Sequence, residues 1–336
     1  MGTPFFLAPM AEISHRALRE LIEDFGGCDR YFSEMISAPA LLAGGPFEKW
    51  YVDTAPKPEK LVFQLVGSVP EALANAAGVL DRLDCAGIDI NMGCSAPLIR
   101  KTGAGAAWLA SIERAGALID IIRPMTKRPL SVKLRIGFKD DFEYLVRFCR
   151  RLEEAGTELI TLHPRTVTEK FKRLARWEYV GMLRKELKIP VAGNGDIASA
   201  EDLLRRADGE CDAVMVGRAA VRMPWIFADA KSSHEPRIST DYPDLHGLVK
   251  ENAGNKITSA SLRLCVRSLE DTGLRFLELL AQHQPPEFHV SRAKRFFSFY
   301  CDNLKWGTYL KNRLNREESL TGMEKVWREY FAANEG

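Results

Sequence analysis

The sequence lacks the long apolar run of roughly 18 residues that a membrane-spanning helix needs. Its first ten residues, MGTPFFLAPM, have no basic stretch ahead of their short apolar run, so we expect neither membrane insertion nor secretion. The sequence also has no large excess of either charge, because 47 Lys and Arg nearly balance 45 Asp and Glu. The net charge of +2 therefore selects no particular partner.

Paired cysteines are also absent. The seven cysteines are scattered, and none stands in a Cys-x-x-Cys pair. Neither a disulfide framework nor a zinc ribbon is expected, and no metal site is indicated. This pattern favours a reducing cytoplasm.

What the sequence does contain is an alternation of short β-branched runs with amphipathic helical stretches through its first two thirds. Strands are predicted at Phe5–Ala8, Arg30–Ser33, Leu61–Leu65, Gly87–Ile90, Ser131–Leu134, Leu159–Leu162, Pro190–Ala192 and Ala213–Val216. Eight such units predict an α/β fold of the (β/α)8 TIM-barrel class, with an open doubly wound sheet as the alternative. Polar residues recur just after the strand ends and favour the barrel, whose loops converge on one face.

The alternation stops after Asp229, and the polar passage Lys231–Asp244 is typical of a linker. A helical pattern follows, so we predict a catalytic barrel at 1–235 and an all-α domain at 245–336. From Arg292 to Arg316, basic and aromatic residues are interleaved. This pattern suits contact with RNA, although aromatic residues at helical spacing are more often core.

The segment DINMGCSAP at Asp89–Pro97 ends a buried strand with Asn91 and presents Cys94 after Gly93. A thiol at a barrel mouth could be a nucleophile, a metal ligand or a proton donor, or a small buried hydrophobe. No His or Cys stands nearby at ligand spacing, which disfavours a metal. The glycines Gly103 and Gly105 allow a close backbone approach.

Two later segments indicate an anion site: VAGNGD at Val191–Asp196 and VGR at Val216–Arg218. Loops after the seventh and eighth strands of barrels commonly bind phosphate. Residues 193–198 also fit G-x-G-x-x-A, but the dinucleotide fingerprint belongs to a first βα turn, so we interpret that match as accidental.

Single polar residues complete the expected site. Lys133 and Arg135 alternate along a strand end, so at least one should point into the barrel mouth. His163 faces the same region, with a structural role as its alternative. Gln64 places an amide inside a strand, where it needs a hydrogen-bonding partner. Together these residues predict a barrel enzyme that binds a phosphorylated ring cofactor.

Nine motifs in order resemble the tRNA-dihydrouridine synthases, flavoproteins that reduce uridines in tRNA. They are LAPM at 7–10, SEMISA at 33–38, FQLVG at 63–67, DINMGC at 89–94, GAGAA at 103–107, VKLRIG at 132–137, HPRT at 163–166, GNGDI at 193–197 and VGR at 216–218. The resemblance covers the barrel and, more loosely, the helical domain.

The resemblance implies FMN at the barrel mouth, NADPH as the reductant and tRNA as the partner, with no obligate protein partner. The implied cofactor-binding residues are Pro9, Met10, Gln64, Asn91, Lys133, His163, Asn194, Gly195, Asp196, Gly217 and Arg218. Contact with the substrate is expected from Asn91, Arg135, Arg165, Lys294, Arg295 and Lys305. Hydride would pass from flavin N5 to C6 of an extruded uridine, while Cys94 protonates C5 as general acid.

The sequence departs from the family pattern at several positions. Ser95 stands where Pro is usual and Leu98 where Lys is common. Glu12 and His15 replace Gly and Asp, and Glu169 and Arg173 replace Gln and Gly. These changes mark a divergent member.

Two other functions remain open at this point. A flavin barrel acting on a free pyrimidine, like a dihydroorotate dehydrogenase, would explain the barrel motifs without needing the C-terminal helices. A tRNA-binding or folding module without chemistry would need those helices but not Cys94. The sequence does not distinguish the tRNA position, or NADPH from NADH.

Overall fold

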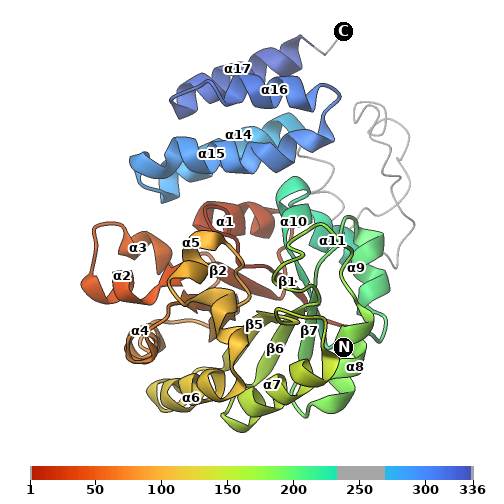
Figure 1. The fold of residues 1–336 in the computed structure, drawn as a ribbon. Helices are drawn as coiled ribbons and strands as arrows, with labels where there is room; N and C mark the ends of the chain where they lie inside the picture. The colour runs from red at the N-terminus through yellow and green to blue at the C-terminus, as the bar shows by residue number, and fades with distance from the viewer. Residues whose placement is uncertain (1, 233–268, 334–336) are drawn as a thin grey trace. The chain divides into compact units, whose positions relative to one another are not determined.

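The barrel is closed by eight parallel strands in chain order, as predicted, with β1 paired to β8 (Figure 1). The computed structural model describes residues 2–232 and 269–333. The strands are β1 Phe5–Leu7, β2 Arg30–Ser37, β3 Leu61–Val66, β4 Gly87–Met92, β5 Leu130–Arg135, β6 Leu159–His163, β7 Val191–Asn194 and β8 Ala213–Val216. Their residues are mostly buried on both faces, which is why they are near-continuous apolar runs.

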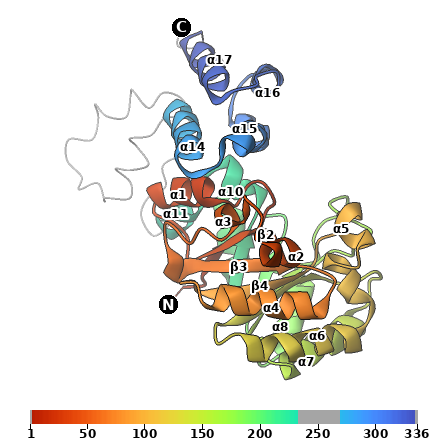
Figure 2. The same cartoon turned by 90° about the vertical axis from the view of Figure 1, so that its left-hand side faces the viewer.

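Helices and helical turns follow the strands as right-handed crossovers require. In the barrel they are α2 Ala38–Ala43, α3 Glu48–Tyr51, η1 Pro58–Lys60, α4 Pro70–Asp81, α5 Pro97–Lys101, η2 Gly105–Ala110, α6 Ile112–Ile122, η3 Arg123–Met125, α7 Phe142–Glu154, α8 Glu178–Glu186 and α9 Ala200–Ala207. Ser111, Asp141 and Ser199 cap α6, α7 and α9, because each side chain accepts from a backbone N–H of the first turn. Figure 2 shows α4 alongside β3 and β4.

The chain forms two compact units. One comprises Met1–His15 and Asp29–Gly217, and the other comprises Arg16–Cys28 and Arg218–Gly336. Thus α1 (Arg16–Asp24), although it follows the first strand, belongs to the helical unit. The boundary that the sequence suggested, between residues 235 and 245, lies outside the described residues.

The helical unit has an aromatic core. Beside α1 its described elements are α10 Arg218–Arg222, α11 Ile226–Ser232, α14 Leu269–His283, α15 Pro286–Tyr300, η4 Cys301–Asn303, α16 Gly307–Leu314 and α17 Leu320–Ala332. The Phe276 and Phe296 rings stack 3.7 Å apart, and Phe296 also stacks on Tyr300 at 4.9 Å. Gly273 is required here, because a Cβ at that position would lie 2.4 Å from the Trp327 ring.

For three of the six aromatic residues of the Arg292–Arg316 stretch, the core interpretation is therefore correct. Phe296, Phe297 and Tyr300 are buried, whereas Trp306 and Tyr309 are 58% and 62% exposed. Within the described ranges, no helix is long and apolar enough to cross a membrane.

Candidate functional site

Polar side chains from neighbouring strands line the interior of β3 to β7, most of them toward the carboxyl ends, although Asp89 lies mid-strand and Ser131 is the second residue of β5. They are Gln64 on β3, Asp89 and Asn91 on β4, Ser131, Lys133 and Arg135 on β5, His163 on β6 and Asn194 on β7. On each strand the polar positions are spaced by two, which places them on the same inward face. The fold thus brings the predicted strand-end residues to one place.

A chain of side-chain hydrogen bonds connects three of these strands. Ser131 Oγ and Gln64 Nε2 both donate to the Asp89 carboxylate at 2.6 Å. Asn91 Nδ2 donates to Gln64 Oε1 at 2.7 Å. The partners that the buried Gln64 amide needs are therefore side chains of β4. Burial raises the pKa of Asp89 to about 6, against the lowering effect of its two hydrogen bonds and of Lys133.

The chain ends at the turn that carries Cys94. Asn91 Oδ1 accepts from the backbone N–H of Gly93 at 3.2 Å and of Cys94 at 2.9 Å, an Asx-type turn. Cys94 is partly exposed, whereas the other described cysteines are buried. A Cβ at Gly105 would lie 2.8 Å from the Cys94 carbonyl, which explains the close approach predicted for this glycine. The thiol is thus presented by a fixed backbone.

Lys133 crosses the barrel interior. Its Nζ donates to Asn194 Oδ1 at 2.9 Å, and Asn194 Nδ2 donates to the Met215 carbonyl at 2.8 Å. Burial lowers the pKa of Lys133 to about 8, helped by the charge of Arg135 and opposed by Asp89 and Cys94. An ammonium group has three donors, so this bond leaves capacity for a ligand.

Arg135 joins two loops. Its Nε donates to the Gly93 carbonyl at 3.1 Å, and one terminal nitrogen donates to the carbonyls of Thr166 and Lys170. Burial and the nearby Arg165 lower its pKa to about 10. The residue predicted to contact substrate therefore also fixes the Cys94 turn against the loop after β6.

His163 is oriented by Arg165. A terminal nitrogen of Arg165 lies 3.0 Å from His163 Nε2, and a guanidinium can only donate, so Nε2 accepts. Arg165 also binds both oxygens of Asp196 at 2.6 and 2.7 Å. Asp196 and Gly195 follow β7 with φ angles of 52° and 127°. This places Asp196, one of the expected phosphate-loop residues, in a partly buried ion pair.

The departures after the HPRT motif have a structural role. Glu169 pairs with Arg176 through both oxygens, at 2.6 and 2.9 Å, and accepts from the Thr166 N–H. The Arg176 bonds are the main reason that the pKa of Glu169 falls to about 2. At the earlier departure, Glu12 has a φ of 63°, a conformation that glycine adopts without cost.

The loops after β1 and β8 contain the remaining predicted cofactor-binding residues. Pro9 and Met10 are half-buried, and a Cβ on Gly217 would lie 3.7 Å from Met10 Sδ. Arg218 is the first residue of α10 in the helical unit. In that unit Lys294 is half-buried on α15, while Arg295 and Lys305 are exposed.

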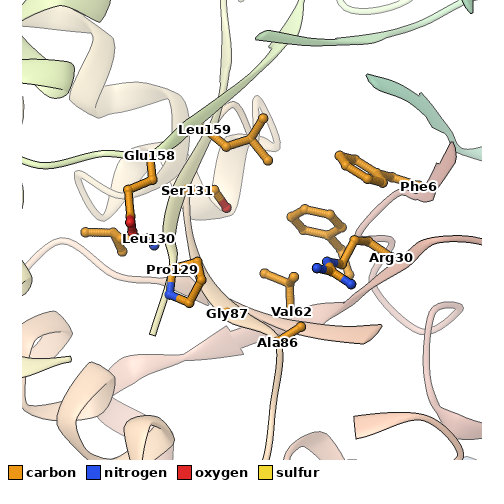
Figure 3. Close-up of a pocket in the computed structure, with 11 residues that line it drawn as sticks. Phe6, Arg30, Val62, Ala86, Gly87, Pro129, Leu130, Ser131, Glu158 and Leu159 are labelled. Atoms are coloured by element: carbon orange, nitrogen blue, oxygen red, sulfur yellow. Dashed lines mark hydrogen bonds between the residues drawn. The ribbon is translucent and has the colours of Figure 1, made fainter. Parts of the chain in front are cut away.

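A cavity of about 120 Å³, partly open to solvent, lies toward the amino ends of the strands, and Figure 3 shows the residues that line it. Phe6, Val62, Gly87, Leu130 and Leu159, from the beginnings of their strands, line it together with Arg30, Phe32, Ala86, Pro129, Ser131 and Glu158. The amino end of a barrel contributes to stability rather than catalysis. This cavity is not the candidate active site.

Sequence reasoning missed Asp89 and Ser131 as site residues. The signal was present, because an ionisable residue between Ile88 and Ile90 in a buried strand must have compensating partners. Their identities required the register that sets Asp89 opposite Gln64 and Ser131.

Comparison with known proteins identifies one family. Residues 6–277 match the model of a family described as "Dihydrouridine synthase (Dus)". A "Probable tRNA-dihydrouridine synthase" of Aquifex aeolicus is 36% identical over 68% of this chain and 73% of that protein. A second "Probable tRNA-dihydrouridine synthase", from Rhodobacter capsulatus, is 32% identical over 68% of this chain and 71% of that protein. A "tRNA-dihydrouridine(47) synthase [NAD(P)(+)]-like" protein of Xenopus tropicalis is 29% identical over 70% of this chain but 37% of its own length.

Proposed function

Because the chain belongs to the dihydrouridine synthase family, we propose that it reduces the C5–C6 bond of a specific uridine in tRNA. The observation that carries this proposal is the Cys94 turn. It holds a partly exposed thiol beside buried polar groups at the end of the barrel where the loops converge. A proton donor in this position is what reduction of a uracil ring requires.

The donor set suits FMN. Lys133 offers a cation with unused N–H groups near the amides of Gln64 and Asn91, which matches the carbonyl and nitrogen edge of a flavin ring. The turns that contain Gly195 and Gly217 lie after β7 and β8, where barrels commonly hold a phosphate. When bound, FMN reduced by NADPH would supply hydride from N5 to uracil C6.

Cys94 supplies the proton. Hydride addition at C6 leaves enolate-like charge, and transfer of the thiol proton to C5 neutralises it. Lys133 and Arg135 lie near enough for their charges to interact with Cys94. Asn91 accepts a hydrogen bond from the Cys94 N–H, and Arg135 donates one to the Gly93 carbonyl, so the turn is held at both groups. The residues of the chain thus fix the position of the acid and place two cations near it.

The helical unit would bind the tRNA. Lys305 lies 5.9 Å from the centre of the Trp306 ring, and Tyr309 is exposed three residues further on. An exposed aromatic pair with nearby cations suits both base stacking and phosphate contact. We assign tRNA phosphates to Lys294, Arg295 and Lys305, and base contact to Asn91, Arg135 and Arg165 at the barrel mouth.

Mass spectrometry of unmodified tRNA tests the function. We expect incubation with FMN-loaded protein and NADPH to add two hydrogens to one uridine, and Cys94→Ala to abolish or greatly slow the gain. Bound FMN and rapid NADPH oxidation without any change in tRNA would contradict the proposal and favour a free pyrimidine substrate.

A further inference from the structure

We propose that Asp89 is a positioning residue which, through Gln64 and Asn91, fixes the backbone turn that presents the Cys94 thiol. Asp89 itself does not contact Cys94; its carboxylate is two side chains away. Its importance for catalysis rests on the proposed function, whereas its effect on the turn does not.

The hydrogen-bond chain has one direction, which the carboxylate at one end and two backbone N–H groups at the other both require. An ionised carboxylate only accepts, so Gln64 must turn its NH2 group toward Asp89. Gln64 Oε1 then faces Asn91, which must donate through Nδ2. Asn91 Oδ1 is therefore left for the N–H groups of Gly93 and Cys94. Those groups are fixed donors, so both ends of the chain require the same amide orientations.

Burial prevents water from replacing a lost link. Asp89 and Gln64 are 0% exposed and Asn91 is 6% exposed. A buried amide that loses its partner must reorient to find another, and reorientation of Gln64 would set an oxygen against Asn91 or leave a donor unsatisfied. The conformation at Cys94 thus depends on a group at the middle of β4.

The charge on Asp89 is costly to keep, which supports a requirement for an acceptor. Burial raises its pKa to about 6, so the group is ionised at neutral pH. The charged and polar groups that face it are Lys133 and Ser131 on β5 and Gln64 on β3. An apolar side chain would fill the same space without this penalty but would give Gln64 no acceptor.

The other side of the turn does not need Asp89. Arg135 Nε donates to the Gly93 carbonyl, and Ala106 N–H donates to the Cys94 carbonyl at 3.0 Å. Loss of Asp89 should therefore release the N–H groups of Gly93 and Cys94 while the carbonyl contacts persist. Amide exchange at these two residues isolates the effect.

Hydrogen exchange of the Gly93 and Cys94 amides, resolved by residue in the full-length protein without tRNA, provides the test. We expect Asp89→Leu and Gln64→Met each to accelerate exchange by at least tenfold. Asp89→Asn should retain the wild-type rate, because its Oδ1 can accept from Gln64 while its Nδ2 donates to Ser131. Thr161→Val is the matched control, since Thr161 is buried in the same barrel and its hydroxyl has no hydrogen-bond partner within residues 2–232 and 269–333.

Unchanged exchange in a cooperatively folding Asp89→Leu protein would overturn the proposal; if that variant does not fold, Gln64→Met decides in the same way. Turnover of tRNA should fall at least tenfold in kcat for Asp89→Leu, with KM for tRNA within twofold of wild type. Faster exchange with normal turnover would show that Asp89 holds the turn but has no role in the reaction. Absence of dihydrouridine formation by the wild type would contradict the proposed function, but the exchange rates would still decide whether Asp89 holds the turn.

Discussion

The two ends of the barrel are both buried but are built differently. At the carboxyl end, Gln64, Asp89 and Asn91 hydrogen-bond to one another inside the barrel. At the amino end, Phe6 and Phe32 pack with ring centres 5.9 Å apart beside the cavity of about 120 Å³. The carboxyl end is held by directional hydrogen bonds at the cost of buried charge, whereas the amino end is largely apolar and imperfectly filled.

The two ends of the barrel should therefore differ in how well they tolerate substitutions. Apolar packing tolerates a small cavity, since each missing contact is weak and non-directional. A buried polar network does not tolerate the loss of a hydrogen-bonding partner, because each polar group left unsatisfied costs about 1–3 kcal/mol. A cysteine flanks strand β4 at each end of the barrel. The buried Cys85 lies just before the strand, and the partly exposed Cys94 lies just after it. Matched substitutions at the two ends can therefore test the comparison.

The largest contrast is expected from the two cysteines. Cys94→Ala should lower the rate of tRNA reduction by about 10²- to 10⁴-fold, because it removes the general acid. Cys85→Ala should leave that rate within about twofold and cost about 1 kcal/mol of stability from lost burial. Single-turnover kinetics and urea unfolding of both variants measure the difference. Equal rates for the two variants would remove Cys94 from the mechanism.

The second contrast concerns tRNA binding. Changing Lys294, Arg295 and Lys305 to Glu should weaken tRNA binding at least tenfold and reduce the slope of log affinity against log salt by about 3, one for each phosphate contact. The control is the same charge change at Lys127, Lys185 and Lys188, which are exposed and precede β5 and β7 at the amino end. Equal effects of the two triple variants would show a general charge effect rather than a binding surface.

A third prediction follows from the pKa of Asp89. Burial raises that pKa from 3.8 to about 6, so between these values the folded state retains a proton that the unfolded state has lost. The contribution of Asp89 to the free energy of unfolding therefore falls as pH rises through this window, by at most about 3 kcal/mol. Lys133 faces Asp89 but keeps its charge there, because its own pKa is about 8.

Asp89→Asn removes this dependence, so its stability relative to wild type should rise between about pH 4 and about pH 7. Urea unfolding of both proteins across this pH range measures the difference in their free energies of unfolding. Parallel curves would mean that the pKa of Asp89 is the same in the folded and unfolded states, so that burial does not raise it.

The smallest effect is expected at the amino-end cavity. Val62 lines it, and Val62→Ile adds one methylene that should stabilise the protein by up to about 0.8 kcal/mol. Val66→Ile, at the carboxyl end of the same strand, is the control and should be neutral or destabilising from overpacking. Thermal unfolding compares them, and a lower midpoint for Val62→Ile would show that the cavity cannot accept the added carbon.

Much of the fold follows from local patterns. The predicted strands agree with the observed ones to within a few residues, and Ala213–Val216 agrees at both ends. Apolar periodicity is a local property that survives folding. The grouping of α1 with the C-terminal helices is not local, because it depends on contacts such as the Arg275–Asp24 ion pair at 3.0 Å. Nothing in the sequence around Arg16 indicates that partner.

The site was predictable in its composition but not in its connections. Strand-end position identified Gln64, Asn91, Lys133 and His163, because parallel strands converge at their carboxyl ends. Arg165 orients His163 from two positions away, but the side-chain to side-chain bonds of the other three join residues 25 to 61 positions apart, such as Gln64 to Asp89 and Lys133 to Asn194. Those pairs arise only when the barrel closes in one register.

The sequence by itself determined the barrel and the family, since each rests on short motifs and local periodicity. Tertiary structure alone decided which aromatic residues of the C-terminal helices are core and which, like Trp306 and Tyr309, are exposed. It also placed Asp89 at the end of the hydrogen-bond chain that leads through Gln64 and Asn91 to the Cys94 N–H. The physical reason is that burial and hydrogen-bond partnership depend on what lies opposite a residue in space, and that information is set when the strands pair.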